Sequence, residues 1–350
     1  MDNLISLSDR IKGCLIGGAV GDALGFPVEF LDVENIVQKH GEKGITEHLV
    51  RNGNALISDD TQMTMFTAEG LLRVKHLRAE SVLNDCVSEI YRSYLDWLKT
   101  QTEEYCSDTS DNTSSLLNEE RLYARRGPGT TCLGALSSEK QGSIKNRINN
   151  SKGCGGVMRI APIPLRFALE PSVSLETVDM IAAEAAAITH GHDLGYIPAA
   201  FVSHIIYLIL KGTDLSEAIL DALGAVKVAF KESPYVKGFS RLIMEAVMQA
   251  ECGLEDSDLD VINILGQGWV AEETVAIAVY CSLKYKDDFE KAIVTSVNHS
   301  GDSDSTGAVT GNIMGALIGY SKIPKKYTDS LELKDCLIKL ASQLEAGVKV

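Results

Sequence analysis

The sequence of 350 residues is short of positive charge, with 33 lysines and arginines against 48 aspartates and glutamates and a net charge of −15. Nucleic-acid binding depends on a lysine- and arginine-rich surface that neutralises phosphate groups, so this balance argues against a nucleic-acid partner. An anionic ligand would instead need a bound divalent cation, or backbone N–H groups at glycine-rich turns and helix N-termini.

Long apolar runs and closely spaced cysteines are also missing. The longest apolar run, Tyr196 to Leu210, contains Ser203 and His204 and falls short of the roughly 20 residues that a membrane span needs. The apolar stretch from 10 to 22 contains four glycines and ends at Asp22, unlike a signal peptide. The eight cysteines, at positions 14, 86, 106, 132, 154, 252, 281 and 336, form no Cys-x-x-Cys pair. We therefore expect a cytoplasmic protein with reduced thiols and no membrane span.

Alternating patterns typical of β-strands are missing too, whereas apolar residues recur at helical spacing through most of the chain. Composition and patterning together predict one all-α domain over residues 1–350, with a polar surface insertion near residues 100–118. We expect helices near residues 9–24, 61–76, 78–98, 156–168, 174–189, 194–211, 214–230, 237–250, 271–284, 288–297, 305–320 and 331–345.

What the sequence does contain is two acidic motifs, each at the predicted start of a helix. They read Ser58-Asp-Asp-Thr61 and Gly301-Asp-Ser-Asp-Ser-Thr306. Taken alone, each is typical of a helix N-terminus, where such residues cap free N–H groups. Together they supply more acids than capping needs, and clustered carboxylate and hydroxyl oxygens are the ligands of hard cations such as Mg²⁺ or Mn²⁺. If the two helix starts converge, they predict a two-metal site.

Glycines recur every four residues in the helices that carry or precede these motifs. They are Gly13, Gly17 and Gly21 in the first helix, and Gly307, Gly311, Gly315 and Gly319 in the later one. Each costs about 1 kcal/mol relative to alanine in a helix interior, so we interpret them as contact points for close helix packing. The first helix leads to Asp22, expected to bond to a neighbouring loop, and to Glu29, a candidate catalytic or metal-adjacent carboxylate.

Two further turns carry residues of chemical interest. The stretch Ser151-Lys-Gly-Cys-Gly-Gly-Val-Met-Arg159 predicts a glycine-rich turn opening into an apolar helix, which can direct N–H groups at a phosphate. The stretch Thr189-His-Gly-His-Asp193 offers two histidines two residues apart. On a helix these would point apart, so an interhelical turn with a polar contact is as good an interpretation as a metal site.

In this order along the chain, the motifs resemble those of the ADP-ribosylglycohydrolase family, which includes dinitrogenase-reductase-activating glycohydrolases and ADP-ribosyl-arginine and ADP-ribosyl-serine hydrolases. The resemblance spans roughly Ile11 to Tyr320. The segments that carry it are Gly17–Gly25 with Glu29, Ser58–Thr61, Gly153–Arg159, Thr189–His190 with Gly195–Tyr196, Gly266–Glu273 and Gly301–Gly307.

The resemblance implies a compact, orthogonal, all-α domain with a central cleft that binds two divalent cations, Mg²⁺ or Mn²⁺. The metal ligands it implies are Ser58, Asp59, Asp60, Asp302, Asp304 and Ser305. It implies Glu29, Asp60 and Asp304 as catalytic residues, with Glu29 and a metal-bound aspartate both open as the group that activates water. It also implies substrate binding by Ser151, Gly153, Cys154, Gly155, Gly156 and His190, with the glycine-rich turn holding the pyrophosphate.

The implied activity is hydrolysis at the anomeric carbon of the ribose, which releases ADP-ribose from an ADP-ribosylated protein. Arginine is the expected linkage, and ADP-ribosyl-serine, O-acetyl-ADP-ribose and ADP-ribosylated nucleic acid are the alternatives. A protein that binds and neutralises an ADP-ribosylating toxin is the alternative of another class. Glycoside cleavage needs a carboxylate near an oxocarbenium-like transition state, and a bound metal would explain how an acidic protein holds an acidic substrate.

Overall fold

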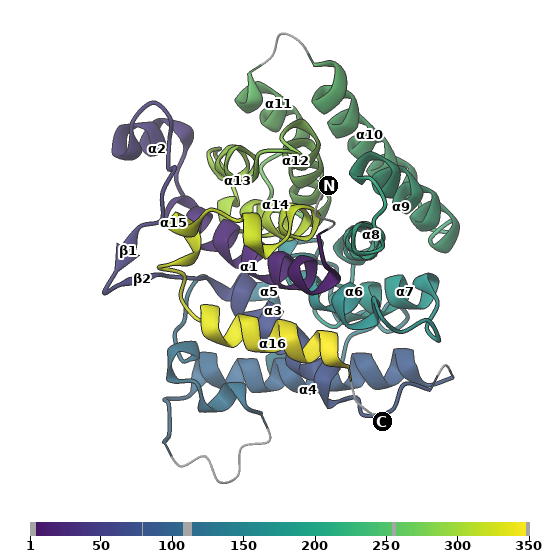
Figure 1. The fold of residues 1–350 in the computed structure, drawn as a ribbon. Helices are drawn as coiled ribbons and strands as arrows, with labels where there is room; N and C mark the ends of the chain where they lie inside the picture. The colour runs from purple at the N-terminus through teal and green to yellow at the C-terminus, as the bar shows by residue number, and fades with distance from the viewer. Residues whose placement is uncertain (1–4, 79, 108–113, 254–256, 348–350) are drawn as a thin grey trace.

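The computed structural model describes residues 5–78, 80–107, 114–253 and 257–347. Within these ranges the chain forms sixteen α-helices (Figure 1). They are α1 (Leu7–Gly25), α2 (Val33–His40), α3 (Asp59–Arg73), α4 (Val82–Thr102), α5 (Thr130–Ser137), α6 (Pro162–Phe167), α7 (Leu175–Ala187), α8 (Asp193–Leu210), α9 (Leu215–Ala229), α10 (Val236–Cys252), α11 (Asp258–Leu265), α12 (Ala271–Lys284), α13 (Phe289–Val297), α14 (Ser303–Ile318), α15 (Lys325–Thr328) and α16 (Lys334–Ala346). The 3₁₀ segments are η1 (Phe26–Val28), η2 (Leu116–Asn118), η3 (Glu120–Leu122), η4 (Cys154–Gly156) and η5 (Tyr320–Lys322).

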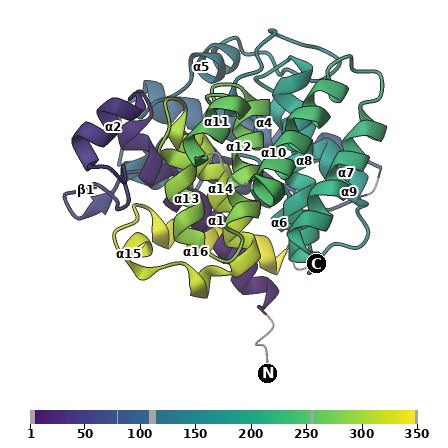
Figure 2. The same ribbon diagram turned by 90° about the horizontal axis from the view of Figure 1, so that it is seen from above.

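The two glycine-bearing helices, α1 and α14, pack against each other in the centre of the molecule (Figures 1 and 2). A methyl group added at Gly17 would collide with the carbonyl of Gly311, and one added at Gly21 with the carbonyl of Gly307. Residue numbers that increase along α1 thus contact residue numbers that decrease along α14, so the two helices are antiparallel. This close packing brings the C-terminal end of α1, which leads to Glu29, beside the N-terminal end of α14.

Asp22, near the end of α1, fixes the start of α3. Its buried carboxylate accepts hydrogen bonds from the N–H of Ser58 at 3.0 Å, from the N–H of Thr61 at 3.1 Å and from the Thr61 hydroxyl. The hydroxyl of Ser58 in turn caps α3 by accepting from the N–H of Asp60 at 3.2 Å. The prediction that Asp22 bonds to a neighbouring loop is confirmed. These hydrogen bonds hold the start of α3 at the end of α1, which also lies beside the start of α14.

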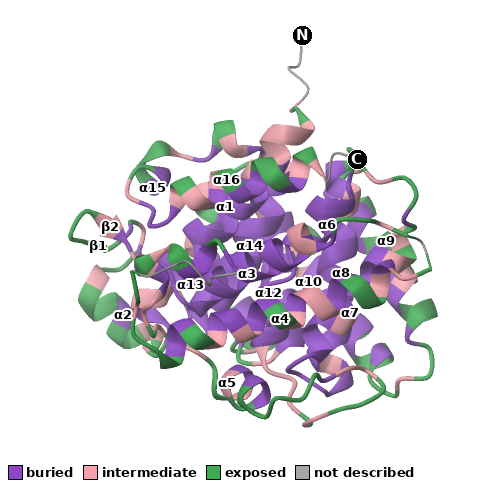
Figure 3. Ribbon diagram, turned by 90° about the horizontal axis from the view of Figure 1, so that it is seen from below, coloured by how far each residue is buried: buried purple, intermediate pink, exposed green. Residues whose placement is uncertain are grey.

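Apolar side chains from all parts of the chain form the core, which includes residues from Ile11 to Leu344 (Figure 3). Two stretches, Leu7–Val28 and Asp193–Leu210, are long and apolar enough to cross a membrane. In each, 83% of the apolar window is buried inside the protein, which is typical of a core helix. Their hydrophobicity is explained by the packing at the centre of the fold.

The all-α fold class is confirmed, and most predicted helices lie within two to four residues of the observed ones. Four short helices, α2, α5, α11 and α15, were not predicted. The predicted helix 156–168 starts too early, although its end is correct to within one residue. η4 and a turn precede α6, which begins at Pro162, a residue favoured in the first turn of a helix. Gly319 lies just after α14, at a positive φ of 79°, and not within it.

One small hairpin departs from the prediction of no strands. Strands β1 (Val50–Arg51) and β2 (Asn54–Ala55) pair antiparallel across Asn52 and Gly53, both at positive φ. An Asn-Gly pair is a strong hairpin signal, so the sequence did carry this information. In the predicted insertion near 100–118, α4 extends to Thr102 and η2 begins at Leu116, while residues 108–113 lie outside the described residues.

Candidate metal and active site

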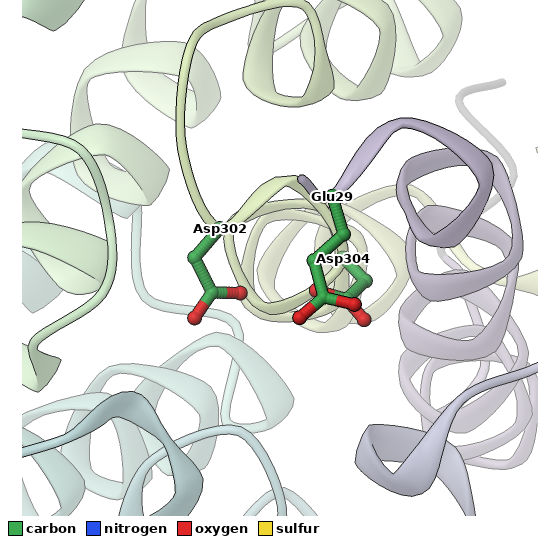
Figure 4. A group of neighbouring side chains, drawn as sticks. All are labelled: Glu29, Asp302 and Asp304. Atoms are coloured by element: carbon green, nitrogen blue, oxygen red, sulfur yellow. The ribbon is translucent and has the colours of Figure 1, made fainter. Parts of the chain in front are cut away.

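Five carboxylates gather where the end of α1 meets the starts of α3 and α14. Asp59 and Asp60 belong to the first turn of α3, Asp302 and Asp304 to the start of α14, and Glu29 follows η1. All five line one cleft of about 360 Å³. Oxygens of the Glu29, Asp302 and Asp304 carboxylates lie within 4.8 Å of one another (Figure 4). The two acidic motifs therefore converge, although some 240 residues separate them.

Among the described residues, no cationic side chain balances these acids. Within the described chain, neither lysine nor arginine lines the cleft. Oε2 of Glu29 and Oδ1 of Asp60 are buried and have no hydrogen-bond partner among the described residues. Leaving a buried carboxylate oxygen unpaired costs free energy, so the arrangement is suited to a group that brings positive charge.

Burial and mutual repulsion shape the ionisation of the cluster. Burial, followed by the nearby charges of Asp302 and Asp59, raises the pKa of Glu29 to about 8. Burial is also the main cause that raises the pKa of Asp60 and Asp304 well above the ordinary range, with neighbouring carboxylates adding to it. A divalent cation would reverse both effects, because it stabilises the ionised form of every carboxylate around it.

Backbone N–H groups and the thiol of Cys154 help to position the carboxylates. Asp302 caps α14 by accepting from the N–H of Ser305 at 3.2 Å, and the same N–H lies 3.0 Å from the Asp304 carboxylate. Asp59 accepts from the N–H of Gly129 at 3.4 Å. The Cys154 thiol donates to Asp302 at 2.7 Å. The glycine-rich turn is therefore attached directly to the acidic cluster.

The two predicted serine ligands lie in different positions. Ser305 lines the cleft together with the carboxylates. Ser58 is fully buried beneath it, where its hydroxyl caps α3 and lies 3.4 Å from an Asp60 oxygen. The structure thus gives Ser58 a definite task in holding Asp60, besides any contact with a metal.

The glycine-rich turn borders the cleft through Gly153, Cys154 and Gly155, whereas Gly156 does not line it. A side chain at Gly156 would collide with the carbonyl of Gly195, which explains why the turn needs a glycine there. Two N–H groups of this turn are already engaged: that of Gly153 donates to the Ser151 hydroxyl, and that of Cys154 to the carbonyl of Trp269. Ser151 therefore positions the turn.

The two histidines between α7 and α8 do not share a site. His190 lines the cleft beside the glycine-rich turn, and its Nδ1 lies 2.8 Å from the hydroxyl of Thr189. Burial, aided by the Arg159 charge, lowers the pKa of His190 to about 3, so the ring is neutral. His192 instead caps α8 by accepting from the N–H of Leu194. The interhelical-turn interpretation is confirmed.

Several cleft residues were missed by the sequence reasoning. The loop before α5 contributes Gly127 to Gly129, and the first turn of α5 contributes Thr130 and Thr131. Phe30 and Trp269 line the same cleft with their rings stacked, 5.5 Å between centroids. Gly-Pro-Gly followed by two threonines is a turn followed by a helix start, so the loop had a readable signal. Nothing in the local sequence could pair Phe30 with Trp269, which are 239 positions apart.

A comparison with protein-family models matches residues 3–349 to the family described as ADP-ribosylglycohydrolase. The chain belongs to the ADP-ribosylglycohydrolase family. This family consists of enzymes, and the match covers the helices that carry every residue of the cleft. The family recognised from the ordered motifs is therefore confirmed.

Relatives named as ADP-ribosylglycohydrolase enzymes match over most of their length. ADP-ribosylhydrolase ARH3 of Mus musculus is 25% identical, over 92% of this chain and 87% of that protein. The ADP-ribosyl-[dinitrogen reductase] glycohydrolase of Rhodospirillum rubrum is 26% identical, over 94% and 92%. ADP-ribosylarginine hydrolase Tri1 of Serratia proteamaculans is 24% identical, over 96% and 79%.

Among solved structures, one titled "ADP-ribosylglycohydrolase-related protein complex" superposes with a TM-score of 0.66. The superposition covers 99% of this chain and 100% of that one, at 23% sequence identity. At this identity the likeness concerns the fold alone, and it agrees with the all-α architecture of the family.

Proposed function

We propose that this member of the ADP-ribosylglycohydrolase family is a divalent-metal-dependent hydrolase that releases ADP-ribose from ADP-ribosylated protein, with arginine as the preferred linkage. The observation that carries the proposal is the convergence of two acidic helix starts on a cleft that no lysine or arginine lines in the described part of the chain. A hydrolase without metal would have little reason to hold five buried acids around one space.

The residues present fit a centre of two Mg²⁺ or Mn²⁺ ions. The donors are carboxylate and hydroxyl oxygens, as these hard cations prefer, and two carboxylate oxygens have no partner among the described residues. The residues that would hold the ions are Ser58, Asp59, Asp60, Asp302, Asp304 and Ser305. When bound, the ions would orient the ribose hydroxyls and favour the ionised form of the surrounding carboxylates.

Glu29 is the best-placed group to move a proton. Its carboxylate lies among the acidic side chains but comes from a different element than the other four, and Oε2 has no partner among the described residues. In the ionised form that a cation would favour, Oε2 can accept a proton from water attacking the anomeric carbon. The requirement for a carboxylate beside an oxocarbenium-like transition state is met at this position.

The neutral His190 and the turn Gly153–Gly155 form another part of the cleft wall. A neutral imidazole adds no charge, so this wall is suited to hydrogen bonding with a phosphate or ribose group. The Cys154 thiol donates to Asp302 and thereby limits the rotation of that carboxylate. We therefore propose that the turn binds and orients the substrate, whereas Glu29 transfers the proton.

The character of the cleft supports the arginine linkage. The group released from an arginine linkage carries a planar guanidinium, which an acidic cleft attracts and which stacks on aromatic faces. Phe30, which is 74% exposed, and Trp269 provide such faces at the cleft. The Serratia relative is named an ADP-ribosylarginine hydrolase, whereas ARH3 carries no linkage in its name.

The test is release of free ADP-ribose, measured by mass spectrometry, from arginine-linked and serine-linked ADP-ribosyl peptides. We expect release from the arginine-linked peptide with Mg²⁺ or Mn²⁺ and none in EDTA. Equal release in EDTA would contradict the metal dependence, and release from the serine-linked peptide alone would contradict the linkage. Binding of ADP-ribose without any release would favour a protein that recognises the modification without removing it.

A further inference from the structure

A second pocket, distant in sequence from the acidic cluster, lies between α7, α8 and α9 and has a volume of about 600 Å³. The three helices lie close together in both ribbon views (Figures 1 and 2). Both α7 and α9 pack against α8. The residues that line the pocket are Leu175, Glu176, Asp179, Met180, His204, Asp221, Gly224, Ala225, Val228, Ala229 and Phe230. None of them lines the catalytic cleft, so the pocket is a separate feature of the surface.

The pocket is acidic. His204 lies between two carboxylates, with Nδ1 2.7 Å from Asp179 and Nε2 2.9 Å from Asp221. A ring that donates from both nitrogens is an imidazolium and carries one positive charge. Asp179, Asp221 and the exposed Glu176 carry three negative charges when ionised, and no lysine or arginine is among the described residues that line the pocket. The net charge at the pocket is therefore negative.

One carboxylate at the pocket is incompletely paired. Asp179 is 7% exposed, and its Oδ1 has no hydrogen-bond partner among the described residues, although Oδ2 is bound to His204. A buried carboxylate oxygen without a donor is costly, and a donor supplied by a ligand would remove that cost. The incomplete pairing at Asp179 thus indicates that a ligand should supply a hydrogen-bond donor.

The rest of the wall is apolar. Met180, Ala225 and Phe230 line the pocket, and Val228 is 75% exposed in spite of its branched apolar side chain. An occupant with an apolar body would remove this surface from water. A bare metal ion fits less well, because both ring nitrogens of His204 already bond to carboxylates on opposite sides of the ring.

From these observations we propose that the α7–α8–α9 pocket binds an organic cation, with an ammonium or amidinium group directed at Asp179 and Asp221 and an apolar body against Met180 and Val228. The helices α7 and α8 also lead to the catalytic cleft, because the turn between them carries His190. The pocket therefore lies at one end of the α7–α8 pair, and His190 lies at the other end.

The probe for this site is benzamidine, and benzamide of the same shape but without charge is its matched ligand control. Titration calorimetry of the full chain should show saturable binding of benzamidine, with benzamide at least tenfold weaker. Similar affinity for the two compounds would overturn the proposal, since it would remove the role of the carboxylates. Absence of saturable benzamidine binding would overturn it as well.

The chain offers a matched pair of glycines to locate the binding. A side chain at Gly224, which lines the pocket, or at Gly238 on α10, which does not, would contact nothing within 4 Å of its Cβ. Gly224→Phe should therefore fill the pocket and weaken benzamidine binding at least tenfold, whereas Gly238→Phe should leave it unchanged. Equal affinity in both variants would overturn the proposal.

Two carboxylate substitutions separate this pocket from the acidic catalytic cleft, which also attracts cations. Asp179→Asn should weaken benzamidine binding at least tenfold, and Asp304→Asn in the cleft should leave it unchanged. The reverse result would place the benzamidine in the catalytic cleft and overturn the proposal. Because Asp179→Asn also loosens the contact with His204, its folding is checked by circular dichroism, and Gly224→Phe gives the answer if it does not fold.

Discussion

Glu332 and Asp304 are both almost fully buried, at 3% and 2% exposed, yet only Glu332 lies against a cationic side chain. The guanidinium of Arg126 pairs with both Glu332 oxygens, at 2.9 Å for one of them, and the N–H of Ile57 adds a third donor at 3.2 Å. Asp304 has four neighbouring acids and, within the described chain, no ion pair. One carboxylate is balanced internally and the other is not.

The difference is informative because the two sites are neighbours. The carbonyl of Arg126 accepts from the N–H of Asp59 at 3.0 Å, and the next residue, Gly127, lines the cleft. The backbone of Arg126 is thus adjacent to the acidic cluster, but its side chain pairs with Glu332 and not with a carboxylate of the cleft. The fold can supply a cation here and does not, so the cleft retains its negative charge for a ligand from solution.

The largest expected effect is that of Asp304→Asn on catalysis. A bound metal supplies several kcal/mol of transition-state stabilisation and each 1.4 kcal/mol is about a factor of ten, so ADP-ribose release should fall by about 1,000-fold. Since burial and the neighbouring acids disfavour the ionised form of Asp304, a neutral amide at this position costs no stabilising charge, and the unfolding midpoint without metal should stay the same or rise. Steady-state kinetics with Mg²⁺ and thermal unfolding in EDTA measure the two effects. Unchanged turnover would remove Asp304 from the site.

Glu332→Gln should lower stability and leave catalysis unchanged, because it breaks a buried ion pair and leaves Arg126 without its counter-charge. We expect the free energy of unfolding, measured in urea, to fall by about 3 kcal/mol. Turnover per folded molecule should be retained below the unfolding transition. Asp335→Asn is the matched control: Asp335 also pairs with an arginine, Arg121, but is 71% exposed, and should cost less than about 1 kcal/mol. Equal losses in the two variants would refute the contrast.

Glu29→Gln sharpens the comparison within the cleft itself. An amide cannot accept the proton from water, so turnover should fall by about 100-fold. Binding of ADP-ribose, measured by calorimetry with Mg²⁺, should be retained, because the contact acts in the transition state. Lost binding with normal folding would instead make Glu29 a residue that holds the ligand or the metal.

How much of this could be predicted from the sequence depends on the range of the interactions. Glycine spacing in α1 and α14 and the two acidic caps are local patterns, and they correctly predicted close packing and the placement of Asp22. Their convergence was a hypothesis, since it depends on an antiparallel contact between segments almost 300 residues apart. The contrast between Asp304 and Glu332 had no local signal, because the pairing of Arg126 with Glu332 spans 206 positions.

The errors have equally specific causes. The helix predicted over 156–168 rested on apolar periodicity, and Pro162 and Pro164 delayed its start while Gly155 and Gly156 favoured a turn. The missed helices α2, α5, α11 and α15 are at most eight residues long, too short to show a convincing period. Both kinds of error fall outside the two acidic motifs, so they did not affect the predicted ligands.

The last expected effect concerns the pH dependence of stability without metal. Burial and nearby acids raise the pKa of Glu29 from its ordinary value of 4.5 to about 8, so the folded state holds a proton that the unfolded state releases. The resulting stability is fully present below pH 4.5 and is lost as the pH rises through about 8. Urea unfolding in EDTA should therefore show the wild type losing stability across this window, relative to Glu29→Gln. Mg²⁺ should abolish this pH-dependent difference, because it stabilises the ionised carboxylate. A difference that persists with Mg²⁺ would mean that the bound metal does not change the ionisation of Glu29.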